Sequence, residues 1–201
     1  MRGEPGFEAL LAAHATGDNL LRLVRFAELI EKWSSTHNLV RYANRRELVD
    51  RHIVDSLAAA PALTGRRRML DVGSGAGLPG IPLLAVVPAL SGVLLEPRQK
   101  RWAFLRTVVR ELDLEAKVLR ARYEALDDCC SFDAITARAV GGVPALLEWA
   151  TAKLLPGGEV LLWTTADRVD ELAKTVGWRV LSSNLPGLDC GRLARLQPCF
   201  T

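Results

Sequence analysis

The chain has 201 residues, of which 49% are hydrophobic and 24% charged, and its formal net charge is +3. This length is enough for one domain with a substantial core, and the composition is typical of a globular protein. No apolar run reaches the length of a membrane-spanning helix, and residues 1–16 lack the basic and apolar regions of a signal peptide. We therefore expect a cytoplasmic protein with no membrane partner.

The cysteines indicate a reducing compartment. The chain has four of them, none in a CxxC pair, and its three histidines lie far from them in sequence. This pattern predicts free thiols and no metal site. The cysteines are Cys129, Cys130, Cys190 and Cys199.

The N-terminal part of the chain has a helical pattern. Apolar residues return at helical spacing from residue 20 to about residue 35, directly after Asp18 and Asn19, which can cap a helix. A second helix is predicted over residues 45–60, and Pro61 and Gly65 would end it. We expect residues 1–65 to form a short helical prefix packed on the main domain.

From residue 66 onward, short apolar runs alternate with helical stretches. Alternating β and α units indicate a mostly parallel, Rossmann-like sheet with helices on both faces. Pro156-Gly157-Gly158 is expected to form a turn before the fifth strand, and the last two strands to pair as an antiparallel C-terminal hairpin. The predicted strands cover residues 68–72, 92–95, 117–120, 132–137, 158–163, 178–183 and 192–199, and the predicted helices cover 79–87, 98–112, 141–154 and 167–176. The expected α/β domain spans residues 66–201 and forms one compact unit with the prefix.

The glycine-rich segment over residues 71–82, DVGSGAGLPGIP, is the most informative stretch. Glycines allow positive φ and let a ligand approach the backbone. The free N–H groups of the helix that follows favour polar or anionic ligand groups. In a parallel sheet such a ligand lies outside the carboxyl ends of the strands.

Two cofactor classes compete for this loop. Residues 75–80 fit the dinucleotide pattern G-x-G-x-x-G, whereas Asp71 with its three spaced glycines resembles the S-adenosylmethionine loop of class I methyltransferases. An acid would repel a pyrophosphate but suits the cationic amino group of methionine, so Asp71 favours the second class. Glu96, at the next strand end, can accept both ribose hydroxyls of either cofactor. A tight turn without a ligand is the third interpretation.

Basic residues gather in three segments. Such clusters would hold a polyanion through phosphate contacts, with an affinity that falls as salt rises. The alternative is ordinary solvated arginine. The segments contain Arg41, Arg45, Arg46, Arg51 and His52; Arg66, Arg67 and Arg68; and Arg98, Lys100, Arg101, Arg106 and Arg110.

Several separated segments together resemble the RsmG (GidB) family, which methylates N7 of a guanine in small-subunit (16S) ribosomal RNA. The glycine loop alone is common to methyltransferases, whereas residues 51–56 together with residues 78–82 are more specific. The matching segments, in family order and spacing, are His37-Asn38-Leu39, Arg51-His52-Ile53-Val54-Asp55-Ser56, residues 71–82, Lys100-Arg101 with Phe104-Leu105, Arg122-Tyr123-Glu124 and Arg138-Ala139.

The resemblance implies a site for S-adenosylmethionine. Gly73 and Leu78 would contact its methionine and ribose region, and Glu96 would meet the ribose hydroxyls. Tyr123 and Glu124 would flank the adenine. The full set of expected cofactor-binding residues is Asp71, Gly73, Ser74, Gly75, Leu78, Glu96, Tyr123, Glu124 and Arg138.

The resemblance also implies a catalytic floor. Arg138 would lie at the boundary between cofactor and substrate. The helical prefix would be linked to the floor of the active site by Arg51, His52 and Asp55.

Simpler interpretations remain open for several of these residues. His52 could be a packing histidine, Asp55 a capping partner of Arg51, and Arg122 with Glu124 an exposed ion pair.

The predicted function is methyl transfer from S-adenosylmethionine to N7 of a guanine in 16S ribosomal RNA, free or within the 30S particle, by a monomer. The chain departs from the family pattern at Val40, where a threonine is usual, and at Thr164, where relatives commonly have a lysine. The alternatives are a methyltransferase with another substrate, an inactive RNA-binding paralogue in ribosome assembly, and a dehydrogenase.

Overall fold

The computed structural model describes residues 4–126, 131–186 and 190–199, without the side chains of Thr36 and His37. Cys129 and Cys130 therefore lie outside the described residues. Cys190 and Cys199 are free and exposed, as the sequence predicts.

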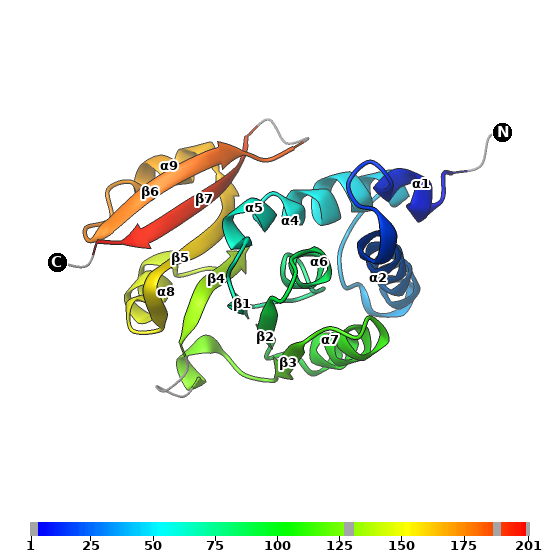
Figure 1. Ribbon diagram of the computed structural model, residues 1–201, viewed down its shortest axis with the longest axis horizontal. Helices are drawn as coiled ribbons and strands as arrows, with labels where there is room; N and C mark the ends of the chain where they lie inside the picture. Colours follow the sequence, from blue (N-terminus) through cyan, green and yellow to red (C-terminus); the bar gives the residue numbers. More distant parts are fainter. Residues whose placement is uncertain (1–3, 127–130, 187–189, 200–201) are drawn as a thin grey trace.

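A seven-stranded sheet runs through the molecule in the order β3-β2-β1-β4-β5-β7-β6 (Figure 1). The first five strands are parallel, while β7 runs antiparallel to both β5 and β6. This arrangement confirms the predicted parallel sheet and C-terminal hairpin. The strands are β1 (Arg68–Val72), β2 (Ser91–Leu95), β3 (Ala116–Leu119), β4 (Phe132–Arg138), β5 (Leu154–Thr165), β6 (Trp178–Asn184) and β7 (Gly191–Pro198).

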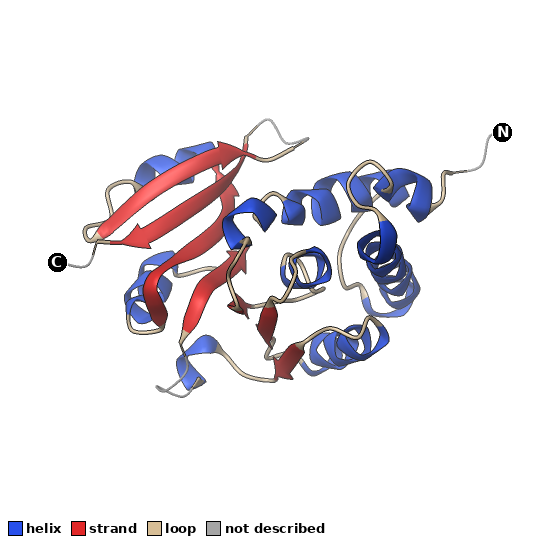
Figure 2. Cartoon of the chain, in the orientation of Figure 1, coloured by secondary structure: helices blue, strands red, loops and turns tan. Residues whose placement is uncertain are grey.

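Helices cover both faces of the sheet (Figure 2). Successive side chains of a strand point to opposite faces, so Met69 joins one core, with Phe104, and Leu70 joins the other, with Leu146. The N-terminal helices share the first core with α6 and α7, while α8 and α9 contribute to the second core. The elements between the strands are α6 (Gly80–Val86), α7 (Gln99–Glu111), the short helix η2 (Tyr123–Ala125), α8 (Val143–Thr151) and α9 (Ala166–Leu172).

The prefix contains more elements than the two predicted helices. The first predicted helix is present as α2, and α1 before it was not predicted. The second predicted helix, over residues 45–60, is present as a continuous helical run over residues 45–57, in which a π-helical turn, η1, separates two α-helical parts. Pro61, expected to end this helix, lies inside α5 instead. The prefix elements are α1 (Phe7–Leu11), α2 (Gly17–His37), α3 (Arg45–Leu48), η1 (Val49–Val54), α4 (Asp55–Leu57) and α5 (Ala60–Leu63).

The predicted turn at Pro156-Gly157-Gly158 is also wrong, because these residues lie inside β5. The register with β4 shifts there: Phe132 pairs with Leu154, whereas Ala134 pairs with Glu159. The surplus residues form a bulge, and Gly157 takes a φ of +77° within it. Proline and glycine therefore mark an irregular strand here and not its start.

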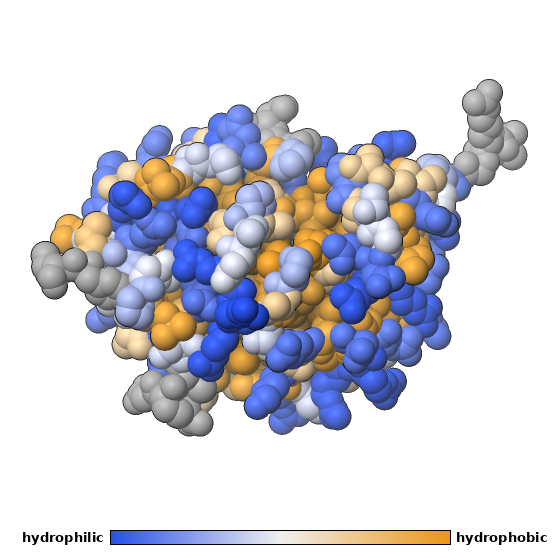
Figure 3. All heavy atoms as spheres, in the orientation of Figure 1, coloured by the Kyte–Doolittle hydropathy of each residue, from blue (hydrophilic) through white to orange (hydrophobic). Residues whose placement is uncertain are grey.

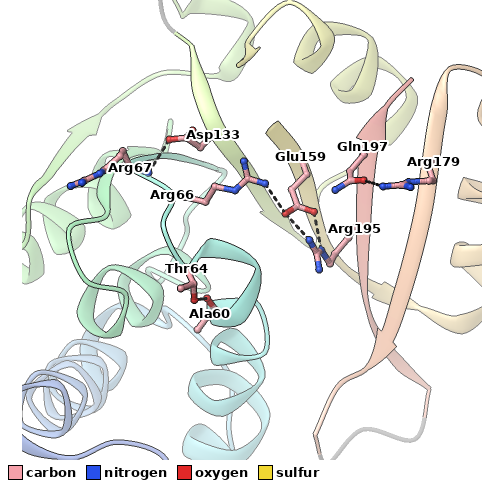
Figure 4. A network of polar contacts seen from close by, with 9 residues as sticks. All are labelled: Ala60, Thr64, Arg66, Arg67, Asp133, Glu159, Arg179, Arg195 and Gln197. Atoms are coloured by element: carbon pink, nitrogen blue, oxygen red, sulfur yellow. Dashed lines mark hydrogen bonds and ion pairs between the residues drawn. The ribbon is translucent and has the colours of Figure 1, made fainter. Parts of the chain in front are cut away.

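A polar network ties the amino ends of β1 and β4 to the hairpin (Figure 4). The fully buried Glu159 accepts two hydrogen bonds from the Arg195 guanidinium, at 2.8 and 2.9 Å, and Arg66 Nη2 lies 3.6 Å from it. Asp133 Oδ2 accepts from the backbone N–H of Arg67 at 2.9 Å. Bidentate pairing compensates the buried charge and fixes β7 against β5.

Hydrophilic residues spread over much of the face seen in Figure 3, with hydrophobic atoms between them. At the edge of the sheet, β6 exposes Ser182, Ser183 and Asn184, and polar residues discourage pairing of an edge strand with another chain. None of the helices in the described part of the chain combines the length and apolar character that a membrane crossing needs.

Candidate active site

The carboxyl ends of four parallel strands meet at one edge of the sheet. A row of register partners crosses them there, consisting of Leu119, Leu95, Val72 and Ala137. Gly73, Glu96 and Arg138 each follow a member of this row, on strands about 5 Å apart. The structure therefore brings the glycine loop and these two charged residues to a single edge, as predicted.

The glycines of the loop divide into two kinds. Gly73 and Gly75 have φ of +71° and +56°, and a Cβ added at Gly73 would meet nothing within 4 Å. By contrast, a Cβ at Gly77 would lie 2.6 Å from Ile81 Cγ1, and a Cβ at Gly80 would lie 2.6 Å from Asp71 Oδ2. Gly73 leaves open space above the loop, and a Cβ at Gly75 would meet only ordinary contacts at 3.6 and 3.7 Å, while the last two glycines allow α6 to pack closely beneath the loop.

Asp71 is fully buried beneath the loop. Its Oδ1 accepts a hydrogen bond from Thr136 Oγ1 at 2.7 Å. Burial raises the pKa of Asp71 to about 6, although the Thr136 hydroxyl acts in the opposite direction. The buried carboxyl of Asp71 lies beneath the loop and bonds to Thr136, so this placement does not favour the expected direct contact with a ligand.

Glu96 and Ser74 close the loop onto β2. Glu96 is 3% exposed, and its carboxylate accepts from the backbone N–H of Gly75 at 3.1 Å and of Arg98 at 2.7 Å. The Ser74 N–H donates to Leu95 O at 2.9 Å, and its hydroxyl donates to Asp71 O at 3.0 Å. Glu96 is thus held rigidly at the strand end, with lone pairs left for a ligand.

Tyr123 and Glu124 form the first turn after β3, in η2. The Tyr123 ring packs edge-on against Trp149 of α8, with ring centroids 5.0 Å apart. Glu124 is exposed. Both residues follow β3 at the same edge of the sheet as the glycine loop.

Arg138 joins the sheet to the π-helical turn of the prefix. Its Nη2 donates to Arg51 O at 2.9 Å, and its Nη1 to His52 O at 3.4 Å. The same Nη2 lies 3.6 Å from Asp55 Oδ2. Nearby, Trp163 of β5 donates from Nε1 to Asp55 O at 2.8 Å. The structure therefore brings the four residues predicted as catalytic into one cluster, in which Arg138 contacts backbone carbonyls of the prefix.

Asp55 is fully buried, and neither of its carboxylate oxygens accepts a hydrogen bond from the described residues. Burial raises its pKa to about 6, while the charge of Arg138 acts to lower it. Its ion-pair partner is Arg138, whereas Arg51 pairs with Glu47 at 3.6 Å, so the alternative of an Asp55–Arg51 pair is wrong. The pKa of half-buried His52 is lowered by burial and by Arg138.

Replacing Asp55 by asparagine is expected to stabilise the protein progressively as pH rises from about 4 to about 7. The folded-state pKa near 6 exceeds the unfolded value of about 3.9, so in this range the folded wild type holds a proton that the unfolded chain has released. Wild-type stability therefore falls as pH rises through this window. We expect the free energy of unfolding of Asp55→Asn, relative to wild type, to rise by about 2–3 kcal/mol. Denaturant unfolding at several pH values measures this difference, and a difference independent of pH would contradict the expectation.

A cavity of about 570 Å³ lies beside this cluster and was not predicted from the sequence. Its walls come from the carboxyl ends of β4 and β5, the loop before α8, and α9. The adjacent Gly141 and Gly142 in that loop were the available signal, since a pair of glycines after a strand often marks an open site. Within the described ranges, no group of three or more His, Cys, Asp or Glu side chains is arranged to hold a metal ion.

Known structures share this architecture. The structure of the mitomycin 7-O-methyltransferase MmcR matches with a TM-score of 0.63 at 19% identity, over 96% of this chain and 67% of that one. A ribosomal protein L11 methylase from Lactobacillus delbrueckii subsp. bulgaricus matches with a TM-score of 0.58 at 11% identity, over 73% of this chain and 78% of that one. The strand order and these neighbours define the class I S-adenosylmethionine-dependent methyltransferase fold.

Sequence comparison narrows this class to one family. The chain belongs to the GidB family, described as rRNA small subunit methyltransferase G, whose model matches residues 19–182. A protein of that name from Xanthomonas campestris pv. campestris is 36% identical over 185 residues, which cover 90% of this chain and 87% of the relative. A second, from Stenotrophomonas maltophilia, is 36% identical over 171 residues, covering 83% and 80%.

Proposed function

We propose that this protein transfers a methyl group from S-adenosylmethionine to N7 of a guanine in small-subunit ribosomal RNA. The observation that carries the proposal is the family match over residues 19–182, which includes every strand end of the candidate site. The expected substrate is the 16S RNA, free or in the 30S particle. The expected enzyme is a cytoplasmic monomer.

The glycine-loop edge fits S-adenosylmethionine. The open space above Gly73 would take the methionine and ribose region, beside Leu78. The fixed carboxylate of Glu96 would accept the ribose hydroxyls, and Tyr123 and Glu124 would flank the adenine. The bound cofactor supplies an electrophilic methyl group on a sulfonium. Asp71 would act from below, by holding the loop in place.

The chemistry requires no general base. N7 of guanine carries a lone pair, so the N7–carbon bond forms as the sulfur–carbon bond breaks, and the positive charge moves to the purine without loss of a proton. Catalysis then rests on alignment and on the surrounding charges. Arg138, paired with Asp55, would be a positioning residue that sets the prefix against the strand ends, and Arg51 and His52 would contribute through their carbonyls.

The start of α7 offers the most accessible cations near the loop. Arg98 and Lys100 are exposed, and Arg101 Nη1 lies 3.7 Å from the position of a Cβ at Gly75. In the prefix, by contrast, Arg45 is paired with Glu31 at 2.8 Å. We infer that phosphates of the RNA are held chiefly at the α7 end of the site.

Replacing Lys100 by alanine is expected to weaken RNA binding at low salt and to reduce its salt dependence. Each phosphate contact contributes about one unit to the slope of log affinity against log salt, so the slope should fall by about one. Filter binding to 16S RNA over a series of salt concentrations measures it. Lys117→Ala is the matched control, because Lys117 is exposed near the amino end of β3, opposite the edge that carries the site, and it should leave the slope unchanged. Equal slopes for Lys100→Ala and wild type would contradict the assignment.

The alternative functions separate in a simple assay. Purified protein is tested for binding of S-adenosylmethionine and of reduced nicotinamide cofactor, and then for methyl transfer to unmethylated small subunits. We expect the protein to bind S-adenosylmethionine and not the reduced nicotinamide cofactor. We also expect the methyl label to appear in the RNA of the subunits. Cofactor and RNA binding without turnover would support the inactive paralogue, and label in another substrate would support a different methyltransferase.

A further inference from the structure

We propose that the cavity between α8 and α9 is the pocket that receives the target guanine, and that Glu171 selects this base. The inference rests on the proposed function and adds the residues that recognise its substrate. The cavity measures about 570 Å³, within the range of roughly 300–1,000 Å³ that small-molecule sites occupy. A base extruded from RNA needs such a space at the strand ends.

The walls of the cavity are largely apolar. Val140, Val143 and Pro144 line it from the loop before α8 and the start of that helix, and Leu162 and Leu172 line it from β5 and α9. A Cβ at either Gly141 or Gly142 would meet nothing within 4 Å, so the loop before α8 leaves the entrance open. Apolar walls with a few polar groups are the usual composition of a ligand site.

Four of the polar side chains that line the cavity are available to a ligand. Glu171 and Arg168 lie three residues apart on α9 and so on one face of that helix. Thr164 and Thr165 lie at the end of β5. In the described part of the chain, none of these four side chains makes a hydrogen bond within the protein, and neither charged one forms an ion pair.

Guanine complements this set of groups. An ionised carboxylate only accepts hydrogen bonds, and guanine offers two adjacent donors, N1–H and the N2 amino group. Adenine would instead turn the acceptor N1 toward Glu171. The Arg168 guanidinium can donate to guanine O6 or to the phosphate of the same nucleotide.

The register places such a base beside the glycine loop. Ala137 lines the cavity and is the register partner of Val72, which directly precedes Gly73. Neighbouring strands lie about 5 Å apart, so the cavity and the loop are adjacent. In guanine, N7 lies opposite the N1 and N2 edge. A base held by Glu171 on α9 would therefore turn N7 away from α9, toward the loop.

The test uses small ribosomal subunits from a strain that lacks this enzyme, methyl-labelled S-adenosylmethionine, and the full-length protein. Glu171→Gln removes the charge that accepts the two donors, and Thr164→Leu fills the cavity without a change of charge. Both are expected to lower kcat/KM for the subunits by about tenfold or more. The Kd for S-adenosylmethionine, from equilibrium dialysis, should change less than about twofold.

Asp170→Asn is the matched control, because Asp170 is exposed on α9 next to Glu171 but does not line the cavity. It should keep a rate within about twofold of wild type. If Glu171→Gln and Thr164→Leu both methylate as fast as Asp170→Asn while the wild type is active, the guanine pocket is overturned and the proposed function stands. If the wild type methylates no subunit, the proposed function fails, and the pocket assignment with it.

Discussion

Replacing Gly77 by alanine is expected to lower the free energy of unfolding by about 3–5 kcal/mol. Gly77 has a φ of +85°, and an added Cβ would lie 2.6 Å from Ile81 Cγ1 and 3.3 Å from Leu105 Cδ2. Both neighbours are fully buried and have no room to move. The loss combines left-handed backbone strain with overpacking, and denaturant unfolding measures it.

Gly73→Ala is the matched comparison. Gly73 also has a positive φ, so alanine there causes the same backbone strain, but its Cβ would meet no atom within 4 Å. It should cost about 1–2 kcal/mol of stability. Its Cβ would instead occupy the space proposed for the cofactor, so the affinity for S-adenosylmethionine should fall by about tenfold or more. If the two variants lost similar stability, or if Gly73→Ala bound the cofactor normally, the division of the loop into open and packed glycines would be wrong.

Replacing Arg138 by alanine is the second change with a large expected effect. It removes the ion-pair partner of the fully buried Asp55, and the hydrogen-bond donor of two carbonyls in the π-helical turn. We expect a loss of about 3 kcal/mol at pH 8, where Asp55 is ionised. Methyl transfer should fall as well, since the prefix would no longer be held against the strand ends.

The stability lost in Arg138→Ala should be partly restored by Asp55→Asn. Asparagine is uncharged, so the double variant leaves no unpaired carboxylate in the interior. We expect the double variant to be more stable than Arg138→Ala at pH 8, with a coupling energy of about 1–3 kcal/mol in a double-mutant cycle. Additive losses would show that the two side chains do not act as a pair.

Much of the fold follows from patterns along the chain. The sheet was predictable because short apolar runs alternate with amphipathic stretches, and the hairpin because the last two runs have no helix between them. The glycine loop was predictable because its spacing serves backbone geometry directly. Glu96 and Arg138 were placed at the site because each follows a buried strand.

Other features depend on contacts that sequence spacing does not encode. The π-helical turn in η1 presents its carbonyls to Arg138, which comes from a distant strand. Gly157 and Gly158 have the sequence pattern of a turn. In the structure they lie within β5, where the register with β4 shifts, and so they form part of a bulge. Asp71 was expected to contact a ligand because it lies two residues before the first glycine, but in the structure its side chain is buried at the end of β1, where it bonds to Thr136. Four separate elements enclose the cavity, so the glycine pair at 141 and 142 indicates an open loop but does not by itself predict the cavity.

The most direct test of the proposed function is to map the methyl label in small ribosomal subunits. Subunits from a strain deleted for this gene are incubated with purified protein and methyl-labelled S-adenosylmethionine, and the RNA is digested and analysed. We predict label at a single guanine, recovered as N7-methylguanine. An absence of label in the RNA, despite demonstrated cofactor binding, would contradict the proposed function.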